Sequence, residues 1–322
     1  PLLPREAILD FDEIVRVVHV AARLGVRKVR LTGGEPLVRK NLPALIGRLA
    51  GEAGLADLAM TTNGTLLADY AQELRRAGLQ RVNISLDTLD RRQFQALTGQ
   101  DALDQVLQGI EAAQAAGFWP IKLNALAIRG FSESQIVPLV RFALERGLEI
   151  RFIEFMPIGI VNQWSPERVL PAAAILSILR REFGSVEPVD SWGPAESEAG
   201  REEETASAVS LVAATETRRG ASFQPPARCY LLGDAGARIG IISSMSRPFC
   251  RSCGRLRLNA IGELRYCLFA QRGWDLRTIL RRGGDDEELI HIFRAAVQAK
   301  PLRPNTPGQQ PQTHLAMCQI GG

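Results

Sequence analysis

The chain has 322 residues, of which 46% are hydrophobic and 23% charged, with a formal net charge of +4. This composition is typical of a globular protein with two domains, or with one barrel and an appendage, and no apolar run approaches the roughly 20 residues that span a bilayer. The basic residues are dispersed and form no block with interleaved aromatics. Nucleic acid is therefore not favoured as a partner, whereas a few converging arginines would suit a small phosphorylated ligand.

The first half of the chain repeats one unit, an amphipathic helix followed by a loop and a short β-branched strand. The first helix begins with the Asp-x-x-Glu spacing of a capping box at Asp10 and Glu13, and apolar residues then recur at helical spacing up to Gly25. The expected strands are 26–32, 58–62, 82–85, 121–127 and 149–155, and the later helices are 42–53, 68–77, 103–116 and 133–146. Such an alternation implies a parallel sheet with right-handed crossovers.

Polar residues in this half favour a barrel over an open doubly wound sheet, which would show the same alternation. They gather toward the carboxyl ends of successive strands: Gly33-Gly34-Glu35, Thr61-Thr62-Asn63, Ser85 with Asp87, Lys122 with Asn124, and Glu154 with Met156. A barrel collects all its strand ends around one mouth, whereas an open sheet offers only its switch point. A complete barrel needs about eight units and this chain shows five, so we expect a partial barrel or one that lacks its first strand.

After Pro157 the alternation stops. A helix is expected at 171–183, and the polar, small-residue segment 191–226 is interpreted as a mobile insertion or linker. Short strands are expected at 229–232, 238–242, 256–259 and 263–267, and helices at 275–280 and 287–299. The expected organisation is a partial barrel over 1–157, a connecting region over 158–227 that contains the insertion, and a C-terminal domain over 228–322.

Three of the five cysteines form the strongest motif, Cys250-x2-Cys253 answered by Cys267. An odd count with this spacing argues against a secreted disulfide framework and indicates a metal site in a reducing, cytoplasmic compartment. A [4Fe-4S] cluster held by three thiolates would leave one iron open to a substrate. Structural zinc would need a fourth ligand, for which the candidates lie away from ribbon-like spacing: Cys229, Cys318 and His314. The spacing of the cysteines alone favours neither zinc nor an iron–sulfur cluster over the other.

Two pairs of basic residues alternate along expected strands. Arg255 and Arg257 follow Cys253 and, on one face of a strand, would clamp phosphate in bidentate fashion. Lys28 and Arg30 show the same alternation near the start of the chain. A solvated strand face is the plainer interpretation of such a pattern, but the neighbouring cysteine disfavours it for the first pair.

Single charges inside apolar strands are the other basic signal. Lys122 and Arg151 occupy such positions, where an unpaired charge would be costly. Pairing with a carboxylate such as Glu154 is the simple interpretation, and convergence on one anion pocket is the functional one. The nearby turn Gly33-Gly34-Glu35-Pro36 lets backbone groups approach a ligand, and Glu35 could accept an ammonium group. It is not a G-x-G-x-x-G fingerprint, so a dinucleotide site is unsupported.

Taken in order, these motifs resemble those of the GTP 3′,8-cyclases of molybdenum cofactor biosynthesis, a family of radical S-adenosylmethionine (SAM) enzymes. The motifs that carry the resemblance are LTGGEP at 31–36, TTNG at 61–64, NISLD at 83–87, FIEFMP at 152–157, C-x2-C-x-R-x-R from Cys250 and GG at 321–322. They cover nearly the whole chain outside about 191–226. The resemblance implies an α/β fold with a partial (β/α)6 radical-SAM-type barrel, its first strand missing, and a C-terminal α+β domain with an auxiliary cluster.

The resemblance also implies roles for individual residues, although no catalytic residue is identified. An auxiliary [4Fe-4S] cluster would be bound by Cys250, Cys253 and Cys267, and its open iron would hold the guanine of GTP. Contacts with SAM are implied for Gly33, Gly34, Glu35, Ser85 and Met156. Contacts with GTP are implied for Lys28, Arg30, Thr61, Lys122, Arg151, Arg255 and Arg257. In the implied reaction, reductive cleavage of SAM gives a 5′-deoxyadenosyl radical that takes hydrogen from ribose C3′, and the C3′ radical attacks C8 to give 3′,8-cyclo-7,8-dihydro-GTP.

One family motif is missing. The Cys-x3-Cys-x2-Cys that holds the SAM-cleaving [4Fe-4S] cluster precedes, in the family, a stretch resembling Pro1-Leu2-Leu3-Pro4. The expectation is an N-terminally incomplete chain, inactive as it stands. The Gly-Gly tail is expected near the active site.

The expected partners are GTP, cyclic pyranopterin monophosphate synthase as the next enzyme and a reductant such as flavodoxin, without membrane or nucleic acid; a homodimer is compatible with the sequence. Two alternatives stay open: a non-catalytic GTP-binding iron–sulfur protein, and a radical SAM enzyme with an auxiliary cluster that modifies a peptide.

Overall fold

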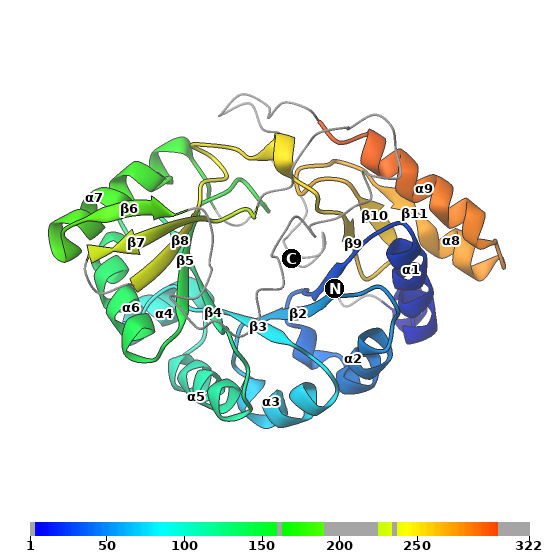
Figure 1. The fold of residues 1–322 in the computed structure, drawn as a ribbon, viewed down its shortest axis with the longest axis horizontal. Helices are drawn as coiled ribbons and strands as arrows, with labels where there is room; N and C mark the ends of the chain where they lie inside the picture. The colour runs from blue at the N-terminus through cyan, green and yellow to red at the C-terminus, as the bar shows by residue number, and fades with distance from the viewer. Residues whose placement is uncertain (1–3, 160–162, 190–224, 234–236, 302–322) are drawn as a thin grey trace.

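The fold is an open arc of strands with helices on its outer side, as Figure 1 shows. The structure, a computed structural model, describes residues 4–159, 163–189, 225–233 and 237–301. Within them, eight strands form one sheet in the order β1-β2-β3-β4-β5-β8-β7-β6. Neighbouring strands from β1 to β5 are parallel, and β8 continues the parallel part beside β5. The predicted α/β fold with a partial barrel is therefore confirmed.

The elements follow the predicted alternation closely. The parallel strands are β1 (Lys28–Leu31), β2 (Asp57–Thr62), β3 (Arg81–Ser85), β4 (Lys122–Ala127), β5 (Glu149–Glu154) and β8 (Ala237–Ile242). The helices around them are α1 (Phe11–Arg23), α2 (Leu42–Ala50), α3 (Leu67–Arg76), α4 (Arg91–Thr98), α5 (Leu103–Ala115), α6 (Glu133–Glu145) and α7 (Ala172–Phe183). Helix α4 was missed by the sequence analysis. The capping box at Asp10 is confirmed, because the Glu13 amide donates to the Asp10 carboxylate and the Asp10 amide to that of Glu13, each at 2.8 Å.

An antiparallel pair completes the sheet beyond β8. Strands β6 (Val186–Val189) and β7 (Arg228–Leu232) pair antiparallel, and β7 pairs antiparallel with β8. Strand β6 is not predicted from the sequence, and the sequence pattern predicts the other two strands as part of the C-terminal domain. Their backbone pairing instead extends the barrel sheet, since Ile239 of β8 lies opposite Ile150 of β5.

The alternation of side chains along each strand separates the core from the inner face of the arc. On β3, Val82 and Ile84 are fully buried and belong to the apolar core beneath the outer helices. Because successive side chains point to opposite faces of a sheet, Arg81, Asn83 and Ser85 point to the concave inner side. The core therefore lies between the sheet and the helices, and the inner face is left for polar groups.

A second, smaller unit lies beside α1 at the open side of the arc (Figure 1). It contains the antiparallel sheet β11-β10-β9, with β9 (Arg257–Leu258), β10 (Glu263–Arg265) and β11 (Trp274–Asp275), followed by α8 (Leu276–Arg281) and α9 (Asp286–Gln298). A separate apolar cluster joins this unit to one side of α1, with Val17 and Val20 from α1 and Leu289 and Phe293 from α9. The predicted C-terminal α+β unit is confirmed.

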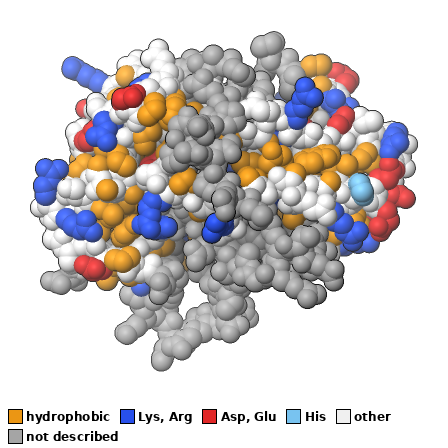
Figure 2. Space-filling view, turned by 90° about the horizontal axis from the view of Figure 1, so that it is seen from above, with side chains coloured by type: hydrophobic (Ala, Val, Ile, Leu, Met, Phe, Trp, Pro, Cys, Tyr) orange, Lys and Arg blue, Asp and Glu red, His pale blue; other side chains and the backbone are white. Residues whose placement is uncertain are grey.

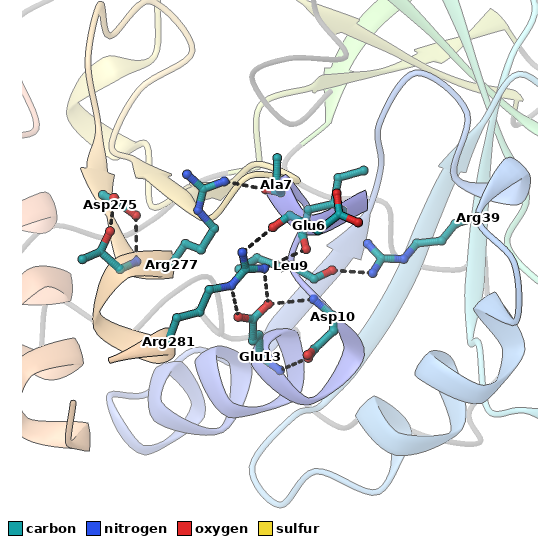
Figure 3. Close-up of polar contacts among 11 residues, drawn as sticks. Glu6, Ala7, Leu9, Asp10, Glu13, Arg39, Asp275, Arg277 and Arg281 are labelled. Carbon is teal, nitrogen blue, oxygen red and sulfur yellow. Dashed lines mark hydrogen bonds and ion pairs between the residues drawn. The ribbon is translucent and has the colours of Figure 1, made fainter. Parts of the chain in front are cut away.

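Arginines of α8 tie this unit to the segment that precedes α1, as Figure 3 shows. Arg277 donates to the carbonyl oxygen of Ala7 at 2.6 Å, and Arg281 to that of Ile8 at 3.0 Å. Arg281 also binds the Glu13 carboxylate at 2.7 Å, and this hydrogen bond lowers the pKa of Glu13. These contacts fix the C-terminal unit relative to the start of the barrel.

The surface agrees with the dispersed charge of the sequence. Figure 2 shows the Lys and Arg side chains of one face scattered among hydrophobic and acidic groups. No helix in the described ranges combines the length and the apolarity that a membrane crossing needs.

Candidate functional site

Two adjacent rows of mostly polar residues cross the inner face of the sheet. They contain four of the predicted site residues, each from a different strand. In the first row, neighbours across the strands are Thr61, Asn83, Lys122 and Glu149, and in the second they are Ser85, Asn124, Arg151 and Gly240. The rows lie two residues apart on each shared strand, so they face the same side. The topology thus brings Thr61, Ser85, Lys122 and Arg151 together, as the barrel hypothesis requires.

The carboxylate that pairs with Lys122 and Arg151 is Glu149, not the Glu154 suggested from the sequence. Lys122 Nζ lies 3.3 Å and Arg151 Nη2 3.5 Å from Glu149 Oε2, and both basic side chains are 9% exposed. Burial, and then the charge of Arg151, lowers the pKa of Lys122 to about 8. Lys122, which is predicted toward the carboxyl end of its strand, is instead the first residue of β4. The Glu149 carboxylate is therefore shared by two buried cations.

Glu154 has a different role, which the sequence analysis missed. Its side chain is completely buried at the end of β5, where its carboxylate accepts the amides of Ala172 at 2.9 Å, Met245 at 2.9 Å and Ser246 at 2.7 Å, and the Ser246 hydroxyl. These donors come from the start of α7 and from the loop after β8. Glu154 therefore joins three segments at the carboxyl edge of the sheet.

A further charged group lies on β1 to β3. The Asp57 carboxylate accepts two hydrogen bonds from the Arg81 guanidinium, the one from Nε at 3.0 Å, and Lys28 Nζ lies 4.0 Å away. The side chain of Arg30 is exposed, but its pKa is lowered to about 10. The main cause is desolvation by the surrounding protein, and the charges of Arg151 and Arg81 come next. Arg81 was missed, although its spacing from Ser85 on one strand would have placed both on the inner face.

The three motif cysteines lie in two neighbouring segments of the C-terminal unit. Cys250 and Cys253 flank a single turn, in which the Cys253 amide donates to the Cys250 carbonyl at 3.3 Å, and Cys267 follows β10. All three are partly buried free thiols. Burial, followed by the proximity of Cys267 and Cys253, raises the pKa of Cys250. The thiols are therefore close enough for the charge of one to raise the pKa of another.

This donor set fits an iron–sulfur cluster in its chemistry. The ligand type is thiolate alone, and the Phe269 amide donates to Cys267 Sγ at 3.5 Å, the kind of hydrogen bond that tunes cluster sulfur. Burial raises the pKa of Cys253, but Arg255 and Lys300 outweigh it and bring the pKa to about 7. Within the described ranges no three His, Cys, Asp or Glu side chains are arranged to hold one metal ion. A single metal ion needs all its ligands around one point, whereas each thiolate that holds a [4Fe-4S] cluster binds a different iron atom.

Arg255 and Arg257 lie next to these thiols. The predicted strand is shorter than expected, so only Arg257 belongs to β9, and Arg255 precedes it with its guanidinium carbon 5.0 Å from the ring centre of Phe249. Burial, and then the charge of Arg255, lowers the pKa of Arg257 to about 10. No ion pair joins Arg30, Arg255 or Arg257 to a carboxylate in the part of the chain that the structure describes.

Lys300 is a buried cation that the sequence analysis missed. Its ammonium donates to the carbonyl oxygens of Arg255 at 2.6 Å and Tyr266 at 2.8 Å. Burial lowers its pKa to about 8, although the thiols of Cys253 and Cys267 act in the opposite direction. A signal was present in the composition, because lysine is rare in this arginine-rich chain and occurs only at 28, 40, 122 and 300.

The turn after β1 is held by Glu35 itself. The Glu35 carboxylate accepts the amides of Leu37 at 3.0 Å and Asn63 at 2.6 Å and the hydroxyl of Thr62 at 2.8 Å. Its oxygens are thus used to join the loops after β1 and β2. A Cβ atom at Gly33 would meet no other atom within 4 Å, so the turn faces open space.

The other predicted SAM residues lie at the same carboxyl edge. Ser85 ends β3, Met156 follows the end of β5, and both are partly buried. The roles assigned to Gly33, Gly34, Glu35, Ser85 and Met156 stay predictions. Four other positions and segments that the sequence analysis discussed lie wholly or mostly outside the described residues: the insertion at 191–226, His314, Cys318 and the Gly-Gly tail.

Comparisons with known proteins cover both parts of the chain. Residues 2–143 match the family model of the Radical SAM superfamily, and residues 196–305 match that of Molybdenum Cofactor Synthesis C. A GTP 3′,8-cyclase of Rhodopirellula baltica is 46% identical over 299 residues, which cover 92% of this chain and 76% of that protein. The GTP 3′,8-cyclase of Pelotomaculum thermopropionicum is 40% identical over 320 residues, with 99% and 89% covered. Among solved structures, methylornithine synthase matches with a TM-score of 0.44 and 19% identity, over 53% of this chain and 52% of that one.

Proposed function

The chain belongs to the family of GTP 3′,8-cyclases, and we propose that it binds GTP inside the arc and converts it to 3′,8-cyclo-7,8-dihydro-GTP, the first step of molybdenum cofactor biosynthesis. One observation carries the proposal: cations without a carboxylate partner in the described residues converge from two distant parts of the chain. Arg30 comes from β1, and Arg255 and Arg257 lie beside the cysteines. Burial is the main cause of the lowered pKa of Arg30, and Arg255 is near enough to add a smaller contribution. A triphosphate supplies the negative charge that such a cluster lacks.

Residues in different parts of the site have different roles. Cys250, Cys253 and Cys267 would hold the auxiliary [4Fe-4S] cluster, which when bound supplies an open iron as a coordination site for the guanine. Lys122 and Arg151, with Lys28, Arg30, Arg255 and Arg257, bind and orient the triphosphate, and Thr61 lies in the same row as Lys122. The open turn at Gly33 and Gly34, with Ser85 and Met156, contacts SAM at the carboxyl edge. Glu35 positions that edge by holding the loop at Asn63.

Several finer points belong to the same proposal. The 322 residues contain no Cys-x3-Cys-x2-Cys, and we propose that SAM cleavage, and with it the conversion of GTP, needs a second cluster whose ligands these residues do not supply. A cytoplasmic location, a flavodoxin-like reductant, cyclic pyranopterin monophosphate synthase as the next enzyme and a homodimeric assembly are also proposed. The division at 157 and 227 is kept as a proposal, with the pairing of β7 and β8 counted toward the barrel.

Anaerobic reconstitution tests the cluster assignment. With iron and sulfide, the chain is expected to take up about four irons. Cys253→Ala should lose most of this iron, because it removes one of three thiolate ligands, whereas Cys229→Ala should retain it. Cys229 is a matched control because it lies buried in β7, where burial raises its pKa to about 11. Metal analysis is the measurement, and one zinc per chain without iron would refute the assignment.

Lys122 is expected to make GTP binding depend on pH. In the free chain its pKa is about 8, and a bound triphosphate stabilises the ammonium form and raises that value. GTP affinity should therefore be full below pH 8 and fall as the pH rises above it, by up to about tenfold per pH unit.

The Lys122→Met variant isolates this contribution. It should bind GTP about 30-fold more weakly at pH 7, the equivalent of about 2 kcal/mol for one charge-assisted contact, and show a flatter pH profile. Calorimetric titration between pH 6.5 and 9 at constant ionic strength measures both effects. Lys40→Met, at an exposed lysine, should behave like the parent chain. Equal pH slopes for parent and Lys122→Met would contradict the role of Lys122.

A further inference from the structure

Lys300 lies at the junction of the two segments that carry the motif cysteines. Its ammonium donates to the carbonyl of Arg255 at 2.6 Å and to that of Tyr266 at 2.8 Å. Arg255 is two residues after Cys253, and Tyr266 immediately precedes Cys267. One side chain therefore connects the turn with two cysteines to the loop with the third.

The position of Lys300 is fixed from its other side by α9. The Lys300 amide donates to the carbonyl of Val297 at 3.2 Å, one turn back in the chain. Val297 and Phe293 are buried in the apolar cluster that packs α9 against α1. The ammonium is thus anchored to a packed helix, independently of the cysteine segments that it contacts.

General packing does not explain a lysine at this place. Lys300 is only 7% exposed, and a buried ammonium is costly unless nearby groups compensate it. The strands beside the cysteines are already joined by the pairing of Leu258 with Leu264 and of Arg257 with Arg265. An apolar side chain would fill the same space without the desolvation cost. A buried positive charge is useful where negative charge gathers, and three thiolates on one cluster provide that charge.

We propose that Lys300 is a positioning residue for the auxiliary cluster: it sets the distance between the Cys253 and Cys267 segments and places a fixed positive charge behind their thiolates. The inference rests on the proposed function, in that it takes the three cysteines as cluster ligands. It adds a residue that follows the end of α9 to a site whose ligands lie in the sequence before α8.

The test compares Lys300→Met, which removes the charge and both hydrogen bonds, with Lys300→Arg, which keeps the charge. Both variants and the parent are reconstituted with iron and sulfide, and the iron per folded chain, the rate of iron loss to a chelator and the reduction potential of the cluster are measured. Lys40→Met is the matched control at an exposed lysine.

Lys300→Met is expected to lose iron to the chelator about tenfold faster than the parent, as do other variants that remove support behind a metal ligand. Its cluster should have a lower reduction potential, because a positive charge near the cluster favours the reduced form, and Lys300→Arg should restore most of that potential. A purely structural role would change the melting temperature of the metal-free chain without moving the potential.

Two results would overturn the inference. Parent-like iron retention and potential in Lys300→Met would remove Lys300 from the site while leaving the cluster assignment intact. A parent chain that takes up no iron would instead overturn the cluster assignment, and with it this inference. If Lys300→Met does not fold, Lys300→Arg carries the test, since its longer, planar group changes the donor geometry, and parent-like iron loss in that variant counts against the proposed positioning.

Discussion

The double variant Arg255→Ala/Arg257→Ala is expected to bind GTP about 1,000-fold more weakly than the parent chain. Neither guanidinium has a carboxylate partner in the described residues. Burial is the main cause of the lowered pKa of Arg257, and repulsion by the charge of Arg255 is the second. A triphosphate would relieve this repulsion and accept several charge-assisted hydrogen bonds. Two such contacts at about 2 kcal/mol each correspond to the stated loss.

The fold should tolerate this change. Arg255 is exposed and stacks on Phe249, a contact that stabilises by about 0.5 to 1 kcal/mol. The three cysteines and Lys300 remain in this variant, so iron uptake should reach the parent level even though Arg255 no longer lowers the pKa of Cys253. The matched control is Arg272→Ala/Arg294→Ala, which removes the same charge from exposed positions of the C-terminal unit. Calorimetric titration with GTP and metal analysis of the same samples give both quantities.

Each departure from this expectation has a separate meaning. Parent-like GTP affinity with full iron content would favour the alternative of a radical SAM enzyme that modifies a peptide, because the cations beside the cluster would then serve another purpose. Loss of iron together with GTP binding would show that the arginines shape the cysteine loop. A similar loss of GTP affinity in the control variant would mean that the net charge of the chain, and not the position of Arg255 and Arg257, determines the affinity.

The barrel was predictable because its strands carry the pattern that burial imposes. Val82 and Ile84 are β-branched residues packed beneath the outer helices, and the polar side chains that alternate with them, Asn83 and Ser85, had to face the other side. The same alternation predicts that residues from several strands lie at one site, without knowledge of how the strands pair. It could not supply the two-residue strand β11 or the short β6, since such segments are defined by their partners.

Ion-pair partners were the main failure of the sequence analysis. Glu154 is the carboxylate suggested by the sequence motif, but it accepts hydrogen bonds from the loop after β8, such as that from the Met245 amide. Glu149 lies opposite Lys122 on the neighbouring strand instead. Strand register decides between the two, and register is a property of the assembled sheet. Lys300 was missed for a related reason, because its contacts with Arg255 and Tyr266 depend on the packing of α9.

The buried carboxylate of Glu154 leads to the largest expected change in stability. Each of its oxygens accepts two hydrogen bonds: one from Ala172 and the Ser246 hydroxyl, the other from the amides of Met245 and Ser246. All four donors point at the side chain, and no water-exposed surface remains on the residue. An amide in this place would turn an NH2 group toward two donors. The carboxyl edge of β5, from which Met156 follows, depends on these bonds.

Glu154→Gln is therefore expected to lower the free energy of unfolding by about 3 to 5 kcal/mol, since two charge-assisted hydrogen bonds are lost and their buried donors are left unsatisfied. Urea titration followed by circular dichroism measures the change. The control Glu182→Gln alters a partly exposed carboxylate that pairs with Arg141, and should cost no more than about 1 kcal/mol because solvent screens such pairs. Ser246→Ala removes only one donor to Glu154 and should fall between the two. A loss below about 1 kcal/mol in Glu154→Gln would mean that the carboxylate is not what joins β5, α7 and the loop after β8.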